Sequence, residues 1–418
     1  MSSTSRSRNQ VNRRQVKALS EVLGTDFKEA LRLGVREYLQ SLLFDIAKAL
    51  MAGEVSSLCG EPHERVPDRK HTRHGYQKGT TVTLDAAKTH IERPRVRNVQ
   101  TNEETVLETY KAINNKAFLD ERTLALVSAG LPERQFAAVL EKGLKRVGVS
   151  PSAISRRVIR STQISLEQFE QRRWEKHRFV ALLFDGVKVG RTMVVACIGV
   201  DLGGRKHVLA VHPGATESAR VCRDLIRKLI DNGLDVDGNY LFVVDGSKAL
   251  RSAIQDRFGK EAVFQRCQEH KIRDVESYLP YKERDRIRSR MQSAYNNRSL
   301  GEASKRLQDV RLDLSLLSDQ AVKSLTEGLD DTLTLHRLGI WGGLRDSLRT
   351  TNIIESAFST LRKKTKNITN WQDEPQVNRW MAHGLMEAEK KFRKVQGRRT
   401  LTRLRRKLEE RYSASQST

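Results

Sequence analysis

Apolar positions change their spacing along the chain, and the change separates helical regions from strand-rich ones. Between Asp26 and Met51 they recur every three or four residues, which predicts an amphipathic helix. Three later runs are apolar, are separated by short turns containing Gly and Arg, and predict an antiparallel meander: Phe179–Phe184, Thr192–Val200 and His207–Val211. From about Lys271 to His336 nearly every segment has helical spacing. The chain is therefore expected to be mixed α/β.

Shorter elements are predicted on both sides of these regions. After the meander, helical and strand patterns alternate as a helix, a strand, a helix and a strand: Glu217–Ile230, Tyr240–Val244, Ser247–Phe258 and Ala262–Gln265. Upstream, Thr80–Leu84 and His90–Glu92 predict two short strands. The segment Glu54–Lys70 contains two prolines and many polar residues, so it predicts a linker.

A helix-turn-helix pattern spans Leu131–Arg160. A predicted helix, Glu133–Leu144, leads into a turn at residues 148–151, after which a second helix with basic residues begins. Arg156 and Arg157 on this second helix are candidate contacts to DNA bases or phosphates. An ordinary helical hairpin would give the same pattern, and the overall charge of the chain favours the DNA interpretation.

The chain carries 76 Lys and Arg against 51 Asp and Glu, a formal net charge of +25. An excess of this size indicates a polyanionic partner, either nucleic acid or an anionic membrane surface. The best apolar run, Thr192–Val200, is far shorter than the roughly 20 residues that cross a bilayer, so no membrane-spanning segment is expected. The segment Lys390–Arg411 holds 11 basic and 2 acidic residues and is a candidate phosphate-contacting helix.

The compartment is predicted from the start of the chain and from its cysteines. Met1–Lys17 is basic and lacks the apolar core of a secretory signal, so it predicts a flexible arm. Four cysteines are too few for a disulfide scaffold and fit a reducing environment. The expected location is the cytoplasm, in association with the nucleoid.

Two aspartates share one local setting. Asp185 follows the run Phe179–Phe184, Asp245 follows Tyr240–Val244, and each precedes a glycine turn. A carboxylate held at the end of a rigid strand suits a hard cation such as Mg²⁺, which binds oxygen ligands and keeps waters for a substrate phosphate. Because Asp-Gly is also a common turn, either position alone has a structural explanation.

A third carboxylate lies far downstream. The segment Leu348–Ser356 opens a predicted helix that runs to about Lys364, and Thr351 or Asn352 can cap it. Glu355 then falls in the first turn, where the helix dipole favours a carboxylate and where the side chain can point back toward a sheet edge. By itself this pattern is only a capping motif.

Together these pieces resemble the bacterial mutator family of insertion-sequence transposases, of the insertion-sequence-256 type and the DDE class. Four segments in matching order and approximate spacing carry the resemblance: Asp185-Gly186-Val187-Lys188, Val243-Val244-Asp245-Gly246, Cys267-Gln268-Glu269-His270 and Leu348–Ser356. It covers roughly Arg73–Val395 and includes a basic segment with a proline, residues 93–97. At Ile353-Ile354 many members have Pro or Ala before Ile, a departure that replaces no functional group.

The resemblance implies an α/β fold: an RNase H-like catalytic domain interrupted by an all-helical insertion and preceded by mostly helical DNA-binding segments. In that fold the first and fourth strands lie side by side, which would bring Asp185 and Asp245 together, and Glu355 returns to the sheet after the insertion. The implied organisation is a basic arm and helical N-terminal region (1–70), a DNA-binding region (71–175) with the helix-turn-helix-like segment (131–160), the first part of the catalytic core (176–270), the helical insertion (271–345), the remainder of the core with the Glu355 helix (346–385) and a basic tail (386–418).

The implied chemistry is two-metal phosphoryl transfer on DNA, with Asp185, Asp245 and Glu355 as metal ligands and Mg²⁺, or Mn²⁺ in its place, as the cofactor. Water would attack first and free a 3′-OH at the end of the element, and that 3′-OH would then attack target DNA. The expected partners are double-stranded DNA, as terminal inverted repeats and as target, and a second copy of the chain when assembled on DNA.

Five further residues are candidates for contacting DNA or supporting the site: Cys267, His270, Trp341, Arg349 and Asn352. Cys267 and His270 match the Cys-x-x-His pair of the family, which has too few ligands for tetrahedral zinc. Trp341 lies near the place where an insertion-domain Trp stacks on a flipped base in several related DDE transposases. An aromatic residue packed inside the helical insertion explains Trp341 equally well.

Two rival functions remain open. The segment His270-Lys271-Ile272-Arg273 fits the His-x-x-Arg of tyrosine recombinases, with Tyr295 as an available nucleophile, although a strand-rich meander does not suit a helical recombinase domain. A non-catalytic DNA-binding regulator built on residues 131–160, a domesticated transposase, would need no metal chemistry. Metal-dependent nicking of DNA would distinguish it from the enzyme.

Overall fold

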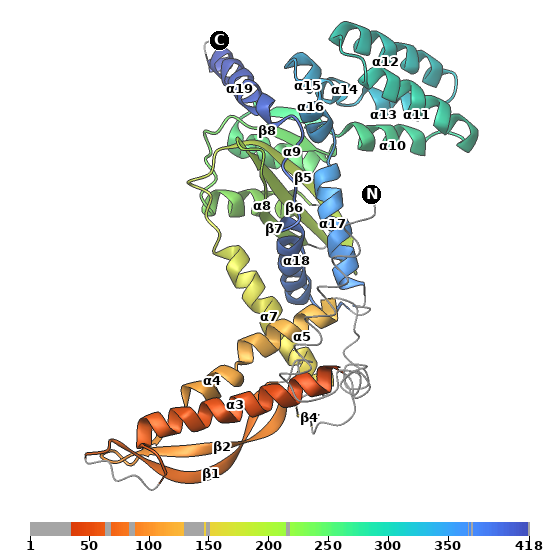
Figure 1. The fold of residues 1–418 in the computed structure, drawn as a ribbon. Helices are drawn as coiled ribbons and strands as arrows, with labels where there is room; N and C mark the ends of the chain where they lie inside the picture. The colour runs from red at the N-terminus through yellow and green to blue at the C-terminus, as the bar shows by residue number, and fades with distance from the viewer. Residues whose placement is uncertain are drawn as a thin grey trace, which may run out of the picture. The chain divides into compact units, whose positions relative to one another are not determined.

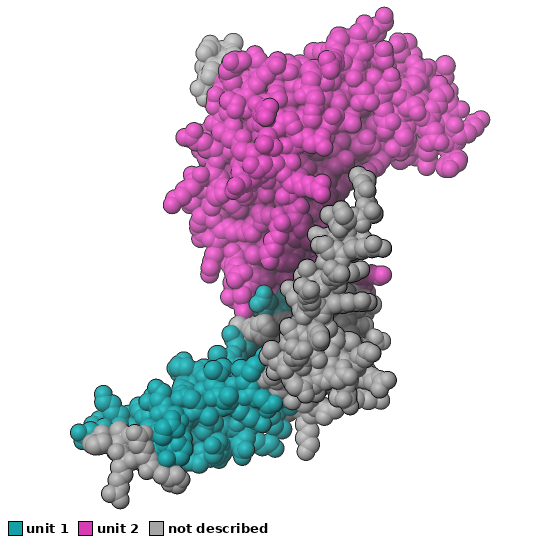
Figure 2. All heavy atoms as spheres, viewed as in Figure 1, with its two compact units in different colours: residues 1–161 teal, residues 162–418 magenta. Residues whose placement is uncertain are grey.

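The computed structural model describes residues 35–62, 68–82, 88–128, 146–147, 151–214, 218–366, 368 and 371–416. The chain divides into two compact units, residues 1–161 and 162–418 (Figure 2). Over the ranges just given, no helix combines the length and the apolar character that crossing a bilayer requires.

The unit of residues 1–161 is built around one helix that lies on a β-sheet. Helix α3 (Val35–Cys59) lies along the long antiparallel hairpin of β1 (His71–Val82) and β2 (Lys88–Asn98) (Figure 1). Residues of α3 and β2 contribute most of the buried core: Ala47, Met51, Val55, Cys59, Ile91 and Val96. The unit also contains β3 (Glu104–Thr105), β4 (Arg146–Val147), α4 (Glu108–Ile113) and α5 (Lys116–Ser128).

The linker predicted from Glu54 begins too early in the sequence. Helix α3 continues to Cys59, because Val55 and Cys59 extend the apolar stripe of Met51 in steps of four residues. Strand β1 begins at His71 and not at Thr80, and both strands of the hairpin are longer than predicted. Antiparallel strands can have one buried face and one polar face, so they contain many polar residues, and the sequence pattern predicts a loop where such residues are frequent.

Only part of the helix-turn-helix prediction can be compared with the structure. The first predicted helix, Glu133–Leu144, lies outside the described residues. Helix α7 (Pro151–Glu170) begins with a proline in its first turn, at the place predicted for the second helix.

The unit of residues 162–418 contains a five-stranded mixed sheet. Its strands are β5 (Phe179–Val189), β6 (Thr192–Asp201), β7 (Lys206–Gly214), β8 (Leu241–Val244) and β9 (Val263–Arg266). They lie in the order β7-β6-β5-β8-β9; the first three are antiparallel, and β8 and β9 run parallel to β5. The predicted meander and both later strands are confirmed, and Leu183 pairs with Val243 where β5 meets β8.

Helices cover both faces of this sheet. Helices α8 (Ala219–Asp231) and α9 (Lys248–Phe258) pack on the face that carries Leu182 and Phe184. On the opposite face, which carries Ala181 and Leu183, lie α17 (Asn352–Thr365), α18 (Glu374–Glu389) and α19 (Leu401–Gln416), the last preceded by the short helix η2 (Arg398–Thr400). Burial on both faces explains why the strands are continuously apolar and do not alternate.

A helical segment, residues 268–348, separates β9 from α17 (Figure 1). It confirms the helical pattern predicted from Lys271 to His336. Residues 272–333 have a core of their own, which includes Ile272, Met291, Leu307 and Leu325, whereas Leu335, Leu344 and Leu348 belong to the core of the sheet. The helices are α10 (Gln268–Ser277), α11 (Tyr281–Tyr295), α12 (Leu300–Ser315), α13 (Asp319–Thr326), α14 (Leu329–Thr332), α15 (Thr334–Arg337) and α16 (Gly343–Leu348).

Candidate active site

Asp185 lies inside β5 and not at its end. The strand continues to Val189 and Gly186 pairs with Val195, so the glycine turn predicted here is wrong. The Asp185 side chain is buried, and the backbone N–H of Gly186 donates to Asp185 Oδ1 (2.8 Å). Burial raises the pKa of Asp185 to about 6; the positive charge of His270 opposes this rise and the negative charge of Asp245 adds to it. A buried carboxylate beside another carboxylate favours a cation at this position.

Asp245 lies one residue beyond β8, the strand that pairs with β5. Its Oδ1 accepts the N–H of Ser247 (2.9 Å), and the Ser247 hydroxyl caps α9. Gly246 has a φ of +121°, and a Cβ atom there would lie 2.6 Å from the guanidinium of Arg266. Because only glycine fits this turn, the turn fixes the position of Asp245 beside the end of β8.

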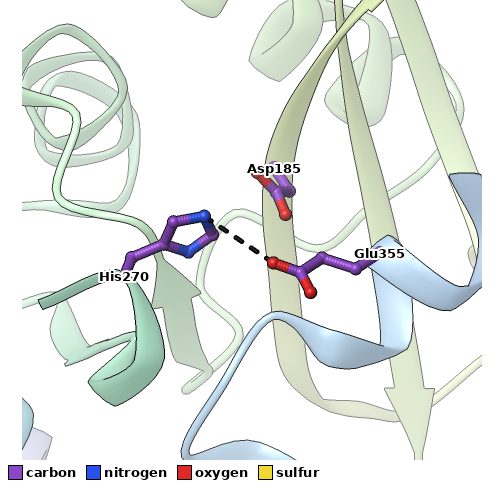
Figure 3. Close-up of side chains that lie close together, drawn as sticks. All are labelled: Asp185, His270 and Glu355. Carbon is purple, nitrogen blue, oxygen red and sulfur yellow. Dashed lines mark ion pairs between the residues drawn. The ribbon is translucent and has the colours of Figure 1, made fainter. Parts of the chain in front are cut away.

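Glu355 reaches the site from the first turn of α17, which packs against β5 and β6. Its Oε1 lies 3.1 Å from Arg273 Nη1 and 3.7 Å from His270 Nε2. Figure 3 shows Asp185, His270 and Glu355 pointing toward one another, and their ligand atoms all lie within 4.8 Å of one another. The structure therefore brings Asp185 and Glu355 together; Asp245, outside this group of three, acts on Asp185 through its charge.

A hydrogen-bond hub joins the start of α10 to the start of α17. The buried Sγ of Cys267 accepts the backbone N–H groups of His270 (3.5 Å) and Thr351 (3.4 Å). Thr351 Oγ1 lies 3.3 Å from His270 Nδ1, and the Thr351 hydroxyl also hydrogen-bonds Asp185. A hydrogen bond between the side chains of His270 and Cys267 raises the pKa of His270 to about 9, with the charges of Asp185 and Asp245 adding to the rise and burial opposing it. His270 is therefore a cation at neutral pH.

The family of the chain follows from its similarity to known proteins along most of its length. Residues 14–395 match the family model described as "Transposase, Mutator family". The chain belongs to this family. The resemblance found in the sequence is thereby confirmed, and at family level the protein is an insertion-sequence transposase, an enzyme that moves DNA.

Individual relatives are similar over 62% to 79% of the chain. The chain is 27% identical over 348 residues to "Transposase for insertion sequence element ISRM5" of Rhizobium meliloti (strain 1021), covering 79% of this chain and 82% of that protein. It is 27% identical over 266 residues to "Transposase for insertion sequence element IS6120" of Mycolicibacterium smegmatis (62% and 80%). It is 24% identical over 336 residues to "Transposase for insertion sequence element IS256 in transposon Tn4001" of Staphylococcus aureus (78% and 83%).

The structure adds two residues to the candidate site of this transposase, Arg273 and Thr351. The sequence assigns Arg273 only to a rival recombinase motif and Thr351 only to a helix cap. Arg273 pairs with Glu355, and Thr351 contacts Cys267 and His270. The spacing of three between His270 and Arg273 is the signal that could have found the arginine, because such residues share one face of a helix.

Trp341 belongs to a different cluster. Its half-buried ring lies edge-on to His336, with ring centroids 4.8 Å apart, and the guanidinium of Arg345 lies 4.9 Å from its centroid. His336 and Arg345 are both buried, and both hydrogen-bond the carbonyl oxygen of Tyr295. These contacts favour packing as the explanation for Trp341, and base stacking stays a prediction.

The remaining candidates differ in exposure. Arg349 donates to Asn296 Oδ1 (3.0 Å), and Asn352 is the exposed first residue of α17. On α7, in the unit of residues 1–161, Arg156 is exposed, whereas Arg157 is buried and burial lowers its pKa. Arg156 is therefore the more accessible of the two arginines for a DNA contact.

Proposed function

We propose that the chain is a DDE transposase that binds the terminal inverted repeats of an insertion sequence and cleaves and joins DNA with Asp185, Asp245 and Glu355. The observation that carries the proposal is the meeting of Asp185 and Glu355, distant in the sequence, beside the strand pair of β5 and β8. The order β7-β6-β5-β8-β9, with three antiparallel strands followed by two parallel ones, supports the RNase H-like part of the proposal.

The donor set fits a hard divalent cation. The pKa of Asp185 is raised to about 6 by burial, and the carboxylate of Glu355 lies beside it, so a cation would offset the cost of burying negative charge. Carboxylate oxygens are the ligands that Mg²⁺ and Mn²⁺ prefer, and imidazole is a ligand for other divalent metals. Asp185, Asp245 and Glu355 would hold the metal, which when bound would stabilise negative charge on the phosphate undergoing transfer.

The chain supplies positive charge of its own at this place. His270 and Arg273 both face Glu355, so they orient that carboxylate, and each can donate to a phosphate oxygen of DNA. The hydrogen bond of His270 Nδ1 with Thr351 leaves Nε2 facing the carboxylate. In the proposed reaction water attacks the phosphodiester at the element end and a 3′-OH leaves. That 3′-OH then attacks a target phosphodiester and displaces the 3′ oxygen of the target strand, which leaves as a 3′-OH, with no covalent protein–DNA intermediate.

Nicking of a labelled terminal-repeat duplex tests the proposal. The variants Asp185→Asn, Asp245→Asn and Glu355→Gln keep the side-chain shape and remove a metal-binding charge. Each should abolish nicking and strand transfer and leave gel-shift binding intact. Asp256→Asn, which changes an exposed carboxylate of α9, is the matched control and should nick at the wild-type rate. A site variant that nicks like the wild type would remove that residue from the proposed site.

The same assay decides between the alternatives. Tyr295 is 1% exposed, so its hydroxyl is not open to a DNA phosphate, and this weighs against a tyrosine recombinase. A wild-type protein that binds terminal repeats but does not nick them in Mg²⁺ or Mn²⁺ would be the DNA-binding regulator. End recognition is assigned to the segment 131–160, mostly outside the described residues, and two copies of the chain are proposed to assemble on DNA.

A further inference from the structure

Six exposed basic side chains form a positively charged surface within residues 162–418, apart from the candidate site. The tail patch consists of Arg178, Arg205, Arg393, Lys394, Arg398 and Arg399. Across the described part of the chain, none of the six lies within ion-pair distance of an acidic side chain. Basic residues near the candidate site are instead in ion pairs: Arg266, Arg273 and Lys248 each lie within ion-pair distance of a carboxylate.

Three segments that are distant in the sequence meet at the tail patch. The N–H of Leu202 donates to the carbonyl oxygen of Arg178 (3.0 Å), and the N–H of Val395 donates to that of Gly204 (2.9 Å). Gly204 has a φ of +78°, and a Cβ atom there would lie 2.7 Å from Arg398 Cβ. Residues 395–398 therefore pack directly on the turn between β6 and β7, and the fold gathers the basic side chains.

The charge of the tail patch is not neutralised locally. Asp201, the acidic residue of the turn, accepts the N–H of Arg205 (2.9 Å) and pairs with His207 (2.9 Å). Residues 390–400 contain six Lys and Arg and no Asp or Glu. A surface of this composition attracts a polyanion, and guanidinium groups bind phosphate oxygens well.

The tail patch and the candidate site lie at different positions along β5. Arg178 immediately precedes Phe179, the first residue of β5, and Asp185 lies six residues further along. At about 3.3 Å per residue this separation is roughly 20 Å. A duplex rises about 3.4 Å per base pair, so roughly six base pairs cover the same length.

We propose that the tail patch binds the phosphate backbone of duplex DNA flanking the phosphodiester that reacts. The inference rests on the proposed function, because it takes the DNA of that reaction as the ligand. The contacts are to phosphates, so they position the duplex and carry no sequence preference. End recognition and end positioning are thereby assigned to different surfaces of the protein.

The experiment compares two full-length variants that lose the same charge. The patch variant carries Arg393→Gln, Lys394→Gln, Arg398→Gln and Arg399→Gln. The control variant carries Gln at exposed basic positions elsewhere in the same unit: Arg257, Lys260, Arg298 and Lys305. Fluorescence anisotropy measures binding of a duplex of arbitrary sequence between about 50 and 200 mM salt. EDTA is present to prevent cleavage, and equal melting temperatures show that both variants are folded.

The expected result is a change in the salt dependence of binding. Each lost phosphate contact lowers the slope of log K against log salt by about 0.9, so the patch variant should lose about 2 to 4 units of slope and the control none. On terminal-repeat DNA the patch variant should need a higher protein concentration than the control variant to reach half-maximal nicking, because it has lost contacts to the duplex. Equal slopes for both variants would overturn the inference.

Failure of the inference and failure of the proposed function give different results. A wild-type protein that binds and nicks, with a patch variant that matches the control, leaves the proposed function in place and removes the tail patch. A wild-type protein that shows no salt-dependent affinity for DNA removes both.

Discussion

His270 and His336 lie near the two ends of the helical segment and differ in charge for physical reasons. The hydrogen bond with Cys267 and the nearby carboxylates raise the pKa of His270 to about 9. Burial, together with the positive charge of Arg345, lowers the pKa of His336 to about 4. One imidazole is thus a cation at the candidate site, and the other is a neutral ring packed against Trp341. Residue type alone predicts neither state; the hydrogen bond with Cys267 is the main cause of the first and burial of the second, and neighbouring charges add to each.

The largest effect expected from this difference is on stability at low pH. The folded pKa of His336 lies below the ordinary value of 6.5, so the unfolded chain binds a proton that the folded chain excludes. Stability should therefore fall as the pH drops from about 6.5 to about 4, by up to about 3 kcal/mol. His336→Gln can still donate to the Tyr295 carbonyl and should lose this dependence. Denaturant unfolding of both proteins across this range measures it, and a pH-independent difference between them would refute it.

The next effect concerns the cationic member of the pair. His270→Gln removes a charged donor that faces Glu355, so nicking should fall roughly ten- to hundredfold, the equivalent of about 1.5–3 kcal/mol for a hydrogen bond to a charged group. His336→Gln, assayed above the titration range of that residue, should nick at close to the wild-type rate. Equal nicking by both variants would show that the charge of His270 has no part in the reaction.

Variants of Trp341 test whether its ring, which packs against the neutral His336, also stacks on a DNA base. Stacking on an aromatic ring contributes about 1–3 kcal/mol per base and offsets the cost of extruding that base. Trp341→Ala should therefore lower cleavage of an intact duplex end by roughly ten- to a hundredfold. Trp341→Phe should recover much of the activity, and a substrate unpaired beside the cleavage site should rescue the alanine variant. Equal defects on paired and unpaired substrates, with a lowered melting temperature, would make Trp341 a packing residue only.

The smallest effect is expected at Thr351, within the hub that fixes His270. Thr351→Val keeps the shape and removes the hydroxyl that contacts Cys267, His270 and Asp185. The loss should be about 1 kcal/mol of unfolding free energy, and Thr351→Ser should restore most of it. Chemical denaturation measures the loss. Identical stabilities for the valine and serine variants would show that the hydroxyl bonds are energetically neutral.

The strands of the five-stranded sheet were predictable because their signal is local. Burial on both faces makes β5, β6 and β8 continuously apolar, and the turns that join β5, β6 and β7 are short. The hairpin of β1 and β2 was harder to predict, because one covered face leaves many polar residues in each strand. Its extent depends on pairing between the two strands, which a single sequence does not display.

The candidate site was predictable only in part for a related reason. Asp245 could be predicted from a strand end and Glu355 from a helix start, whereas the strand end expected at Asp185 was wrong and the family resemblance carries that prediction. The contacts of Glu355 with His270 and Arg273 depend on how α10 packs beside α17, and that packing is set by residues far apart in the sequence. The spacing of three from His270 is the one local signal for Arg273, and it shows only that the two residues share a face of α10.

The bonds between the start of α10 and the start of α17 also bear on folding and on evolutionary change. The N–H of Gln268 donates to the Arg349 carbonyl (3.0 Å), and Thr351 bonds to Cys267 although 84 positions separate them. The helical segment thus begins and ends at one place beside the sheet, where Cys267 and Gln268 are hydrogen-bonded to Arg349 and Thr351; we call this junction the neck. Once the neck forms, docking of α17 no longer requires closure of a long loop, which lowers its entropy cost. Helices within residues 272–333, which have a core of their own, can therefore change in length without displacing Glu355, whereas Leu335, Leu344 and Leu348 pack in the same core as α17 and are constrained by it.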